Sequence, residues 1–307
     1  MSEFSFEGRV AVVTGAGRGI GRAHARLLAQ RGAKVVVNDL GGSKDGEGAD
    51  DGPAQTVAKE IAADGGIAVA DTHDVSTPEG GQAIIDTSLD HFGRVDILIN
   101  NAGIVRQGGL PDVTLNNLEH HLDVHLVGSF TTLQAAWPYF VEQGYGRVVL
   151  TTSSGVFGLD NNLSYAAAKG GVIGLARSTA LAGEPHGIKV NLIAPAAQTR
   201  MGGGEISDDA EPVPGQPFLP PAAVAPMVAF LAHESCPVNG EMYAAGAGRF
   251  NRVFLASTQG YAHPPSHDTP TVEDVAANWA RINDEADYYV PSDLTAWSAE
   301  YLKHQFM

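Results

Sequence analysis

The sequence predicts an α/β protein with a doubly wound parallel sheet, and three observations support this fold class. Short apolar segments without polar alternation recur through the first two-thirds of the chain, as expected of strands that are buried on both faces of a sheet. Longer segments with helical patterning separate them, which gives βαβ units and parallel neighbours. A glycine-rich turn joins the first apolar segment to the first helical one, as in many open α/β sheets.

Six strands and the helix that follows the first of them can be predicted from the pattern of apolar residues. Strands are predicted at Val10–Thr14, Lys34–Asn38, Ile67–Ala70, Val95–Ile99, Val148–Thr152 and Lys189–Ala194. The first helix is predicted at Gly19–Gln30, because apolar residues such as Ile20 and Leu27 fall on one stripe. A sheet of about seven strands flanked by helices is expected.

The composition excludes several classes of partner and compartment. Lys and Arg total 19 against 35 Asp and Glu, for a net charge of −16, which argues against nucleic acid because that binding needs cations to neutralise phosphates. Cys236 is the single cysteine, so no intrachain disulfide is expected and a reducing compartment is favoured. The absence of a long apolar run and the presence of Glu3 near the start predict a cytoplasmic protein with no membrane partner.

The glycine-rich turn, Thr14 to Gly21, has the pattern of a phosphate-binding loop. In this context the glycines allow a tight turn, close approach of a pyrophosphate to the backbone and close packing of helix on sheet. The helix that follows offers free N–H groups and a positive dipole end. A Rossmann-type dinucleotide site is therefore predicted here, the alternative being a plain strand-to-helix turn.

Asp39 follows the second strand and suggests which dinucleotide binds. A carboxylate at this place accepts hydrogen bonds from the adenosine ribose and repels a 2′-phosphate, so it favours NAD over NADP. Arg18, inside the glycine turn, is the counter-argument, because its cation could hold a 2′-phosphate.

Tyr165 and Lys169 are four residues apart on a predicted helix, which places both side chains on one face. A free tyrosine is a poor base at neutral pH. A nearby ammonium stabilises the phenolate and lowers the pKa of the phenol, so that Tyr165 could exchange a proton with an alcohol.

Four motifs in this order resemble the short-chain dehydrogenase/reductase superfamily: Thr14 to Gly21, Asn100 to Gly103, Thr151 to Ser154 and Tyr165 to Lys169. Further segments are similar to the (3R)-hydroxyacyl-CoA dehydrogenase domains of peroxisomal multifunctional enzymes type 2. These are Val37 to Gly42, Val124 to Phe130, Ile193 to Pro195 with Arg200 and Met201, His233 to Cys236 with Asn239 and Gly240, and Ala276 to Trp279.

The resemblance implies roles for individual residues. Ser153 is expected to orient the substrate oxygen, Tyr165 to act as general acid/base, and Lys169 to bind the nicotinamide ribose. The implied catalytic set is Ser153, Tyr165, Lys169 and His125. With the glycine turn and Asp39, the cofactor site becomes Gly15, Arg18, Gly19, Ile20, Gly21, Asp39, Asp74, Val75, Asn101, Ala102, Gly103, Tyr165, Lys169, Pro195 and Thr199. For Asp74 and Thr199, a simple turn or cap is the alternative.

Three departures from the superfamily pattern leave questions open. Counting forward from Gly146 gives Ser153 as the catalytic hydroxyl, whereas counting back from Tyr165 gives Thr152; Ser153 is preferred. His125 replaces the usual helix asparagine, and it either serves a proton relay or packs in the core. Ala196 follows Pro195 where glycine is usual. A metal site at His120, His121 and His125 is not expected, since no further ligand is evident.

One domain is expected over residues 1–256, with a helical extension over 257–307 that packs on this domain or on a partner subunit. Within the extension, helices are predicted at 271–287 and 294–305, with a capping signal at Thr271 to Asp274. Gly41–Gly52 is expected to be an exposed loop. Residues 202–221 are expected to form a substrate lid, or else a plain insertion.

The predicted function is that of an NAD-dependent oxidoreductase acting on a (3R)-hydroxyacyl-CoA. The candidate cationic contacts for the CoA phosphates, chosen by loop position, are Arg106, Arg249 and Arg252. A 17β-hydroxysteroid or other alicyclic alcohol dehydrogenase is the first alternative. A non-catalytic NAD sensor is the second, although a pure binder needs no Ser/Tyr/Lys set. The resemblance also implies a homodimer or homotetramer.

Overall fold

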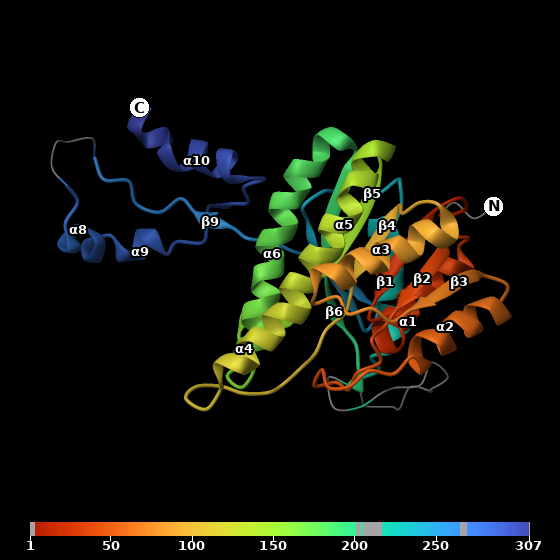
Figure 1. Ribbon diagram of the computed structural model, residues 1–307. Coiled ribbons are helices and arrows are strands. Elements are labelled where there is room, and N and C mark those ends of the chain that lie inside the picture. Colours follow the sequence, from red (N-terminus) through yellow and green to blue (C-terminus); the bar gives the residue numbers. More distant parts are fainter. Residues whose placement is uncertain (1–3, 201–203, 205–216, 265–268, 307) are drawn as a thin grey trace. The chain divides into compact units, whose positions relative to one another are not determined.

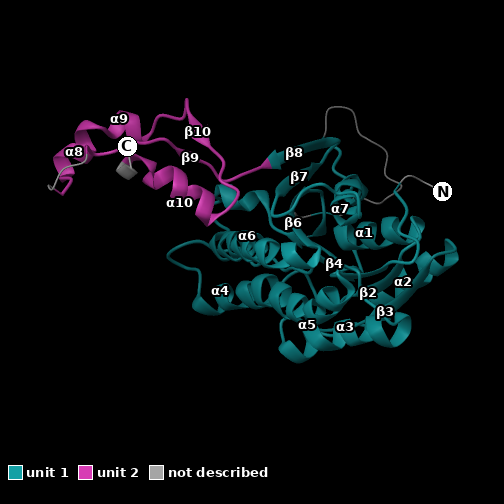
Figure 2. Ribbon diagram, turned by 90° about the horizontal axis from the view of Figure 1, so that it is seen from above, with its two compact units in different colours: residues 1–252 teal, residues 253–307 magenta. Residues whose placement is uncertain are grey.

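The computed structural model describes residues 4–200, 204, 217–264 and 269–306. The chain divides into two compact units, residues 1–252 and 253–307 (Figure 2). Most of the segment 202–221, expected as a lid, lies outside the described residues.

The first unit is built on an eight-stranded sheet with the order β3-β2-β1-β4-β5-β6-β7-β8 (Figure 1). The strands are β1 (Val10–Thr14), β2 (Lys34–Asn38), β3 (Ile67–Asp71), β4 (Ile97–Asn100), β5 (Gly146–Thr151), β6 (Ile188–Ala196), β7 (Met242–Gly246) and β8 (Arg249–Val253). The pairs from β3 through β7 are all parallel. The α/β fold class is thus confirmed, and β8 is the strand beyond the seven expected.

Helices cover both faces of this sheet. The helices are α1 (Gly19–Gln30), α2 (Gly52–Ala63), α3 (Pro78–Phe92), α4 (Leu115–His121), α5 (Gly128–Gln143), α6 (Leu163–Gly183) and α7 (Ala225–Ala232). Helices α3, α5 and α6 lie on one side, with α1 and α7 on the other (Figure 2). Buried residues of β1, β2, β4 and β5 form the core between these two layers of helices, and this close packing keeps the strand ends rigid.

The strand order reverses between β1 and β4, because β1 is followed in the chain by β2 on one side while β4 lies on its other side. The loops that leave the carboxyl ends of these two strands part in opposite directions, and a crevice opens at this point of an α/β sheet. The motifs that follow β1, β4 and β5 therefore meet at one edge.

In its described residues, the second unit contains a two-stranded antiparallel sheet and three short α-helices. Its elements are β9 (Ser257–Thr258), α8 (Val272–Ala277), α9 (Trp279–Ile282), β10 (Tyr288–Tyr289) and α10 (Leu294–Leu302). The capping box at Thr271 and Asp274 is present. The single helix predicted at 271–287 is wrong, because Asn278 leaves helical geometry and its side chain bonds Asp274 O at 2.8 Å.

Within the described residues, none of the helices combines the length and the apolar character that a membrane span requires.

Candidate active site

The glycine turn between β1 and α1 is fixed by contacts that leave no room for side chains. Gly15 has φ +62°, and a Cβ there would lie 2.7 Å from Ala102 Cα. A Cβ on Gly21 would lie 2.2 Å from Gly15 O. Asn101 Nδ2 donates to Thr14 O and Gly15 O, both at 3.0 Å. The turn is therefore tied to the end of β4, as a backbone cradle for a ligand requires.

The N-terminus of α1 opens toward this turn. Its N-cap residue, Arg18, makes no capping hydrogen bond, and no acidic residue stands in the first turn. Free backbone N–H groups and the positive end of the helix dipole favour an anion at this place. The donor set thus fits the diphosphate of a dinucleotide.

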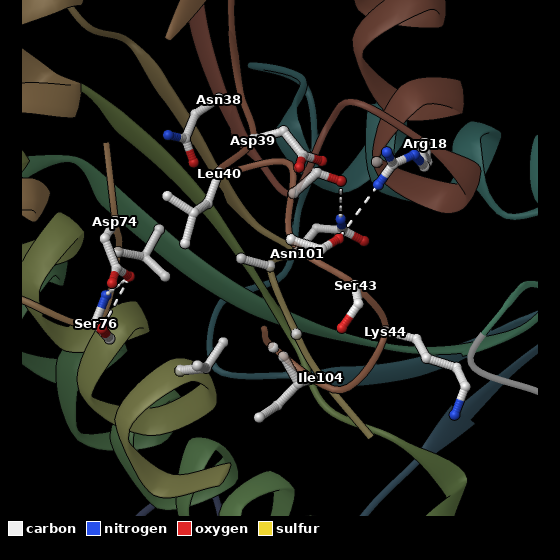
Figure 3. Close-up of a pocket in the computed structure, with 18 of the residues that line it drawn as sticks. Arg18, Asn38, Asp39, Leu40, Ser43, Lys44, Asp74, Ser76, Asn101 and Ile104 are labelled. Atoms are coloured by element: carbon white, nitrogen blue, oxygen red, sulfur yellow. Dashed lines mark hydrogen bonds between the residues drawn. The ribbon is translucent and has the colours of Figure 1, made fainter. Parts of the chain in front are cut away.

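The Asp39 carboxylate is held at the end of β2 by backbone donors. Gly17 N–H donates to Oδ2 at 2.8 Å, and Gly41 N–H donates to Oδ1 at 2.7 Å. Arg18 turns to the loop instead, where its guanidinium donates to Gly42 O at 3.3 Å (Figure 3). The carboxylate and the cation therefore have separate partners.

A cavity of about 300 Å³ runs between these elements (Figure 3). The sequence-predicted residues that line it are Gly15, Arg18, Gly19, Ile20, Gly21, Asp39, Asp74, Val75, Asn101, Ala102, Gly103 and Thr199. Asp74 Oδ1 is oriented by Ser76, whose N–H and hydroxyl donate to it at 2.9 and 2.8 Å. Sequence reasoning missed Ser43, Lys44, Gly46 and Ile104, which line the same cavity.

Tyr165, Lys169 and Pro195 do not line this cavity. Pro195 lies in β6, paired with Ala245 of β7. Tyr165 and Lys169 belong to a second cluster at the end of β5, together with Ser153 and His125. The predicted site residues therefore form two neighbouring groups, joined through the segment Asn101 to Ile104.

In the second cluster, a Cβ on Gly155 would lie 3.4 Å from Ser153 Oγ and 3.5 Å from Tyr165 Cε1, so these two side chains lie next to each other. Burial raises the pKa of the Tyr165 phenol, and the neighbouring Ser153 hydroxyl opposes that rise. Lys169 Nζ donates to Thr151 O at 2.7 Å and lies 5.7 Å from the centre of the Tyr165 ring. Burial lowers the pKa of Lys169 to about 7.

Thr152, the other candidate hydroxyl, faces the protein interior. Its side chain is fully buried, and Oγ1 donates to Lys169 O at 2.8 Å. Thr152 thus ties the end of β5 to α6, while Ser153 is left to face Tyr165.

His125 lies in a six-residue π-helical segment, Leu122–Val127, between α4 and α5. Its ring meets the Tyr165 ring edge-on at 5.2 Å, and Nε2 lies 2.9 Å from Ile104 O. Nδ1 is buried and has no hydrogen-bond partner in the described part of the chain. Burial, with the charge of Lys169, lowers the pKa of His125 well below its usual value, so the ring is neutral.

His121 is held in the same way by backbone groups. Its Nδ1–H donates to Asn117 O at 2.8 Å, and Nε2 accepts from Arg106 N–H at 3.1 Å. Burial lowers the pKa of His121, which favours this neutral form. In the described residues no group of three His, Cys, Asp or Glu side chains is arranged to hold a metal.

The arginines suggested for CoA phosphates have other positions than expected. Arg106 is directed to the loop 41–52, where it bonds Asp45 O and Glu47. Arg249 and Arg252 lie in β8 rather than in a loop, and Arg252 pairs with Glu241 at 2.7 Å. The structure thus does not bring these three side chains together as one phosphate site.

Comparison with known proteins agrees with this geometry. The family model for short chain dehydrogenases matches residues 9–209. The chain is 46% identical to a short-chain type dehydrogenase/reductase of Mycobacterium tuberculosis, over 90% of this chain and 94% of that protein. It is 44% identical to peroxisomal multifunctional enzyme type 2 of Drosophila melanogaster, over 91% of this chain and 46% of that enzyme.

Solved structures are also similar to this one. The full-length Drosophila multifunctional enzyme superposes with a TM-score of 0.78 at 34% identity, covering 97% of this chain and 49% of that one. This chain therefore spans about half the length of that enzyme. A 7α-hydroxysteroid dehydrogenase complexed with NADH and 7-oxo glycochenodeoxycholic acid superposes with a TM-score of 0.70 at 28% identity, covering 80% of this chain and 95% of that one. With its glycine turn, its Ser153, Tyr165 and Lys169 cluster and these matches, the chain belongs to the short-chain dehydrogenase/reductase family of oxidoreductases.

Proposed function

We propose that this oxidoreductase uses NAD to interconvert a secondary alcohol and a ketone, with a (3R)-hydroxyacyl-CoA as its substrate. The observation that carries the chemistry is the placement of the Ser153 hydroxyl next to Tyr165, with Lys169 one turn further along α6. The substrate class rests on the similarity to the Drosophila multifunctional enzyme, which extends over 97% of this chain.

The residues of the second cluster divide the work of proton transfer. Ser153 donates a hydrogen bond to the substrate oxygen and holds it beside the Tyr165 hydroxyl. Tyr165 accepts the alcohol proton in oxidation and returns it in reduction. Lys169, in its protonated form, stabilises the phenolate, because a nearby positive charge favours the charged form of the phenol. The nicotinamide ring, when bound, supplies the hydride chemistry.

The preference for NAD over NADP is supported by the surroundings of Asp39. Both carboxylate oxygens are held in place by backbone N–H groups, so the charge cannot swing away from a 2′-phosphate. Arg18, the residue that could balance such a phosphate, donates instead to Gly42 O. A carboxylate fixed at this place favours ribose hydroxyls over a 2′-phosphate.

The surface beside Ser153 and Tyr165 supports a substrate with an apolar part. The loops 105–114 and 155–163 are joined by a hydrogen bond from Gly108 N–H to Asn161 O at 2.8 Å. On them and at the start of the helices that follow, large apolar side chains are exposed: Leu110, Leu115, Phe157, Leu159 and Leu163. Exposed apolar side chains grouped at the mouth of a site are typical of hydrophobic ligands.

The same rim also favours a second candidate, a hydroxysteroid. The 7α-hydroxysteroid dehydrogenase similar to this chain binds a steroid together with NADH. A steroid needs the apolar rim and no cations, whereas a CoA thioester also needs contacts for its phosphates.

The experiment is to follow NADH formation by absorbance with purified protein and NAD, offering a (3R)-hydroxyacyl-CoA, its (3S) epimer and a 17β-hydroxysteroid. We expect turnover of the (3R) thioester alone. Tyr165→Phe should lower kcat/KM by about 10²- to 10⁴-fold, the usual contribution of a general acid/base. Turnover of the steroid without the thioester would overturn the substrate, and full activity of Tyr165→Phe would overturn the mechanism.

A further inference from the structure

Arg106 lies between the dinucleotide cavity and the cluster that contains Tyr165. Arg106 follows the segment Asn101 to Ile104, which lines the dinucleotide cavity. Its side chain is only 19% exposed. A fully exposed arginine would lose little by pointing to solvent, so the direction of this largely covered side chain needs a cause.

The side chain of Arg106 holds the loop that follows β2. Nε donates to Asp45 O at 2.5 Å, and Nη2 donates to Glu47 Oε1 at 2.6 Å. Backbone contacts run in parallel, because Val105 N–H donates to Lys44 O at 3.0 Å. A Cβ on Gly46 would lie 3.0 Å from Ile104 Cγ2, so the loop is seated on Ile104 itself.

The backbone of Arg106 is anchored on the opposite side. Its N–H donates to His121 Nε2 at 3.1 Å, and Asn117 Nδ2 donates to its carbonyl at 3.4 Å. His121 in turn meets the Tyr165 ring edge-on at 6.3 Å. The arginine is therefore fixed to α4 on one side and reaches the loop on the other.

The loop that Arg106 holds forms one wall of the cavity. Ser43, Lys44 and Gly46 line it, together with residues of the glycine turn. Figure 3 shows Ser43 and Lys44 beside Ile104 along this wall. Residues 43–47 are thus held in the cavity wall by the side chain of Arg106.

We propose that Arg106 is a positioning residue that holds residues 43–47 closed against the dinucleotide and so slows its release. The proposal rests on the proposed use of a nicotinamide dinucleotide, but not on the identity of the substrate. Most of the effect comes from the bond to Asp45 O, which is charge-assisted. The Glu47 side chain is 74% exposed, so its ion pair contributes little.

The test compares NADH binding by the wild type, Arg106→Ala, Arg106→Lys and Glu47→Gln. Arg26→Ala is the matched control, because Arg26 pairs with Asp64 on the surface and does not line the cavity. The dissociation constant is measured by NADH fluorescence, and the dissociation rate by stopped-flow displacement with excess NAD. Hydrogen exchange of the amides at 43–47 and 105 reports whether the wall has opened.

We expect Arg106→Ala to raise the dissociation constant about tenfold, mainly through a faster dissociation rate, the size expected for loss of one charge-assisted hydrogen bond. Arg106→Lys should fall between, because a lysine ammonium keeps the charge but lacks the planar guanidinium whose Nε–H is directed at Asp45 O. Glu47→Gln and Arg26→Ala should stay within about twofold of the wild type. The amides of residues 43–47 should exchange faster in Arg106→Ala alone among the alanine variants.

Unchanged NADH release in a folded Arg106→Ala or Arg106→Lys protein overturns the proposal. A lower melting temperature with unchanged release and unchanged exchange at 43–47 does so as well, since it shows a purely structural arginine. If Arg106→Ala does not fold, Arg106→Lys decides by the same two measurements. Failure of the wild type to bind NADH overturns both this inference and the proposed cofactor, whereas binding without thioester turnover overturns the proposed substrate alone.

Discussion

Burial divides the hydroxyl and amine groups at the end of β5 into those that hold the backbone and those that face the reaction. Thr152 and the Lys169 carbonyl form one buried bond, and Lys169 Nζ and the Thr151 carbonyl form another. Both bonds tie β5 to α6. Ser153 is the neighbour whose hydroxyl lies next to the Tyr165 side chain. A one-residue step along the chain thus separates a structural hydroxyl from the proposed catalytic one.

We predict that Ser153→Ala lowers mainly the activity, whereas Thr152→Val lowers mainly the stability. Ser153→Ala should lower kcat/KM by about 10²-fold or more, because it removes a hydrogen bond to the reacting oxygen. It should leave the free energy of unfolding nearly unchanged. Thr152→Val should lower that free energy by about 1 kcal/mol, because the Lys169 carbonyl loses its buried donor. Its kcat/KM should remain within about threefold of the wild type.

The measurements are steady-state kinetics and urea unfolding of both variants. An active Ser153→Ala protein beside an inactive but stable Thr152→Val protein would return the catalytic role to Thr152. The sequence could not decide this point, because counts from Gly146 and from Tyr165 disagree by one residue. The length of the loop between β5 and Tyr165 decides which count is right, and the folded structure is needed to see which hydroxyl lies next to Tyr165.

At the scale of elements, prediction from sequence succeeded where a segment is defined by its own residues. The strands β1 and β2 and the helix α1 have the predicted bounds, because each is a continuous or periodic apolar run with a turn at its end. The π-helical segment at 122–127 and the attachment of residues 43–47 to Arg106 were not predicted. The attachment of residues 43–47 depends on contacts between distant parts of the chain, which local pattern does not encode.

Helix α1 also contains a feature that its periodicity conceals. His24 lies on its buried face and is 1% exposed. Neither ring nitrogen has a hydrogen-bond partner within the described residues. Burial alone lowers the pKa of His24 to about 3. The element therefore carries an ionisable group that folding keeps neutral.

This histidine should make the protein sensitive to acid. The pKa of His24 in the folded state, about 3, is below its ordinary value of 6.5, so between these values the unfolded chain binds one more proton than the folded one. The contribution of neutral His24 to the free energy of unfolding is fully present above pH 6.5. It is lost as the pH falls toward 3, by up to about 1.4 kcal/mol per pH unit. We predict that His24→Met reduces the loss of stability between pH 7.5 and pH 5.

The check is urea unfolding of the wild type and His24→Met at several pH values, with His91→Gln as the control because His91 is exposed. The variant should have the shallower pH dependence and the control the same slope as the wild type. Parallel slopes for all three proteins would show that His24 does not become protonated on unfolding in this range.

At the scale of the molecule, the two units differ in how they are stabilised. The unit of residues 1–252 has an extensive core between its sheet and helices. In residues 253–307 none of the described side chains is buried. Large apolar side chains there are exposed instead: Phe254, Leu255, Val272, Val275, Trp279, Tyr288, Leu294, Tyr301 and Leu302. A segment of this length without a core needs cover from another surface to stay folded.

The sequence assigned this extension to packing on the domain or on a partner subunit, and the expected homodimer or homotetramer would supply the latter surface. Both remain predictions, as does the cytoplasmic location. The fold class and family followed from motifs that each lie within a few residues. Packing of the extension depends on surfaces that no local motif specifies, so sequence pattern could not resolve it.

We predict that the amides of α8, α9 and α10 are protected from hydrogen exchange in the full-length protein, because their apolar side chains are covered in solution. Protection that disappears on dilution, together with dissociation seen by light scattering, would assign the cover to a partner subunit. Protection at every concentration would assign it to the same chain. Leu294→Asp should abolish protection in either case, since it places a charge in the covered surface, whereas Glu285→Gln, exposed in the same unit, should leave it unchanged. Exchange as fast as in an unfolded peptide throughout 253–307 would contradict the prediction and show that this unit carries its apolar side chains uncovered.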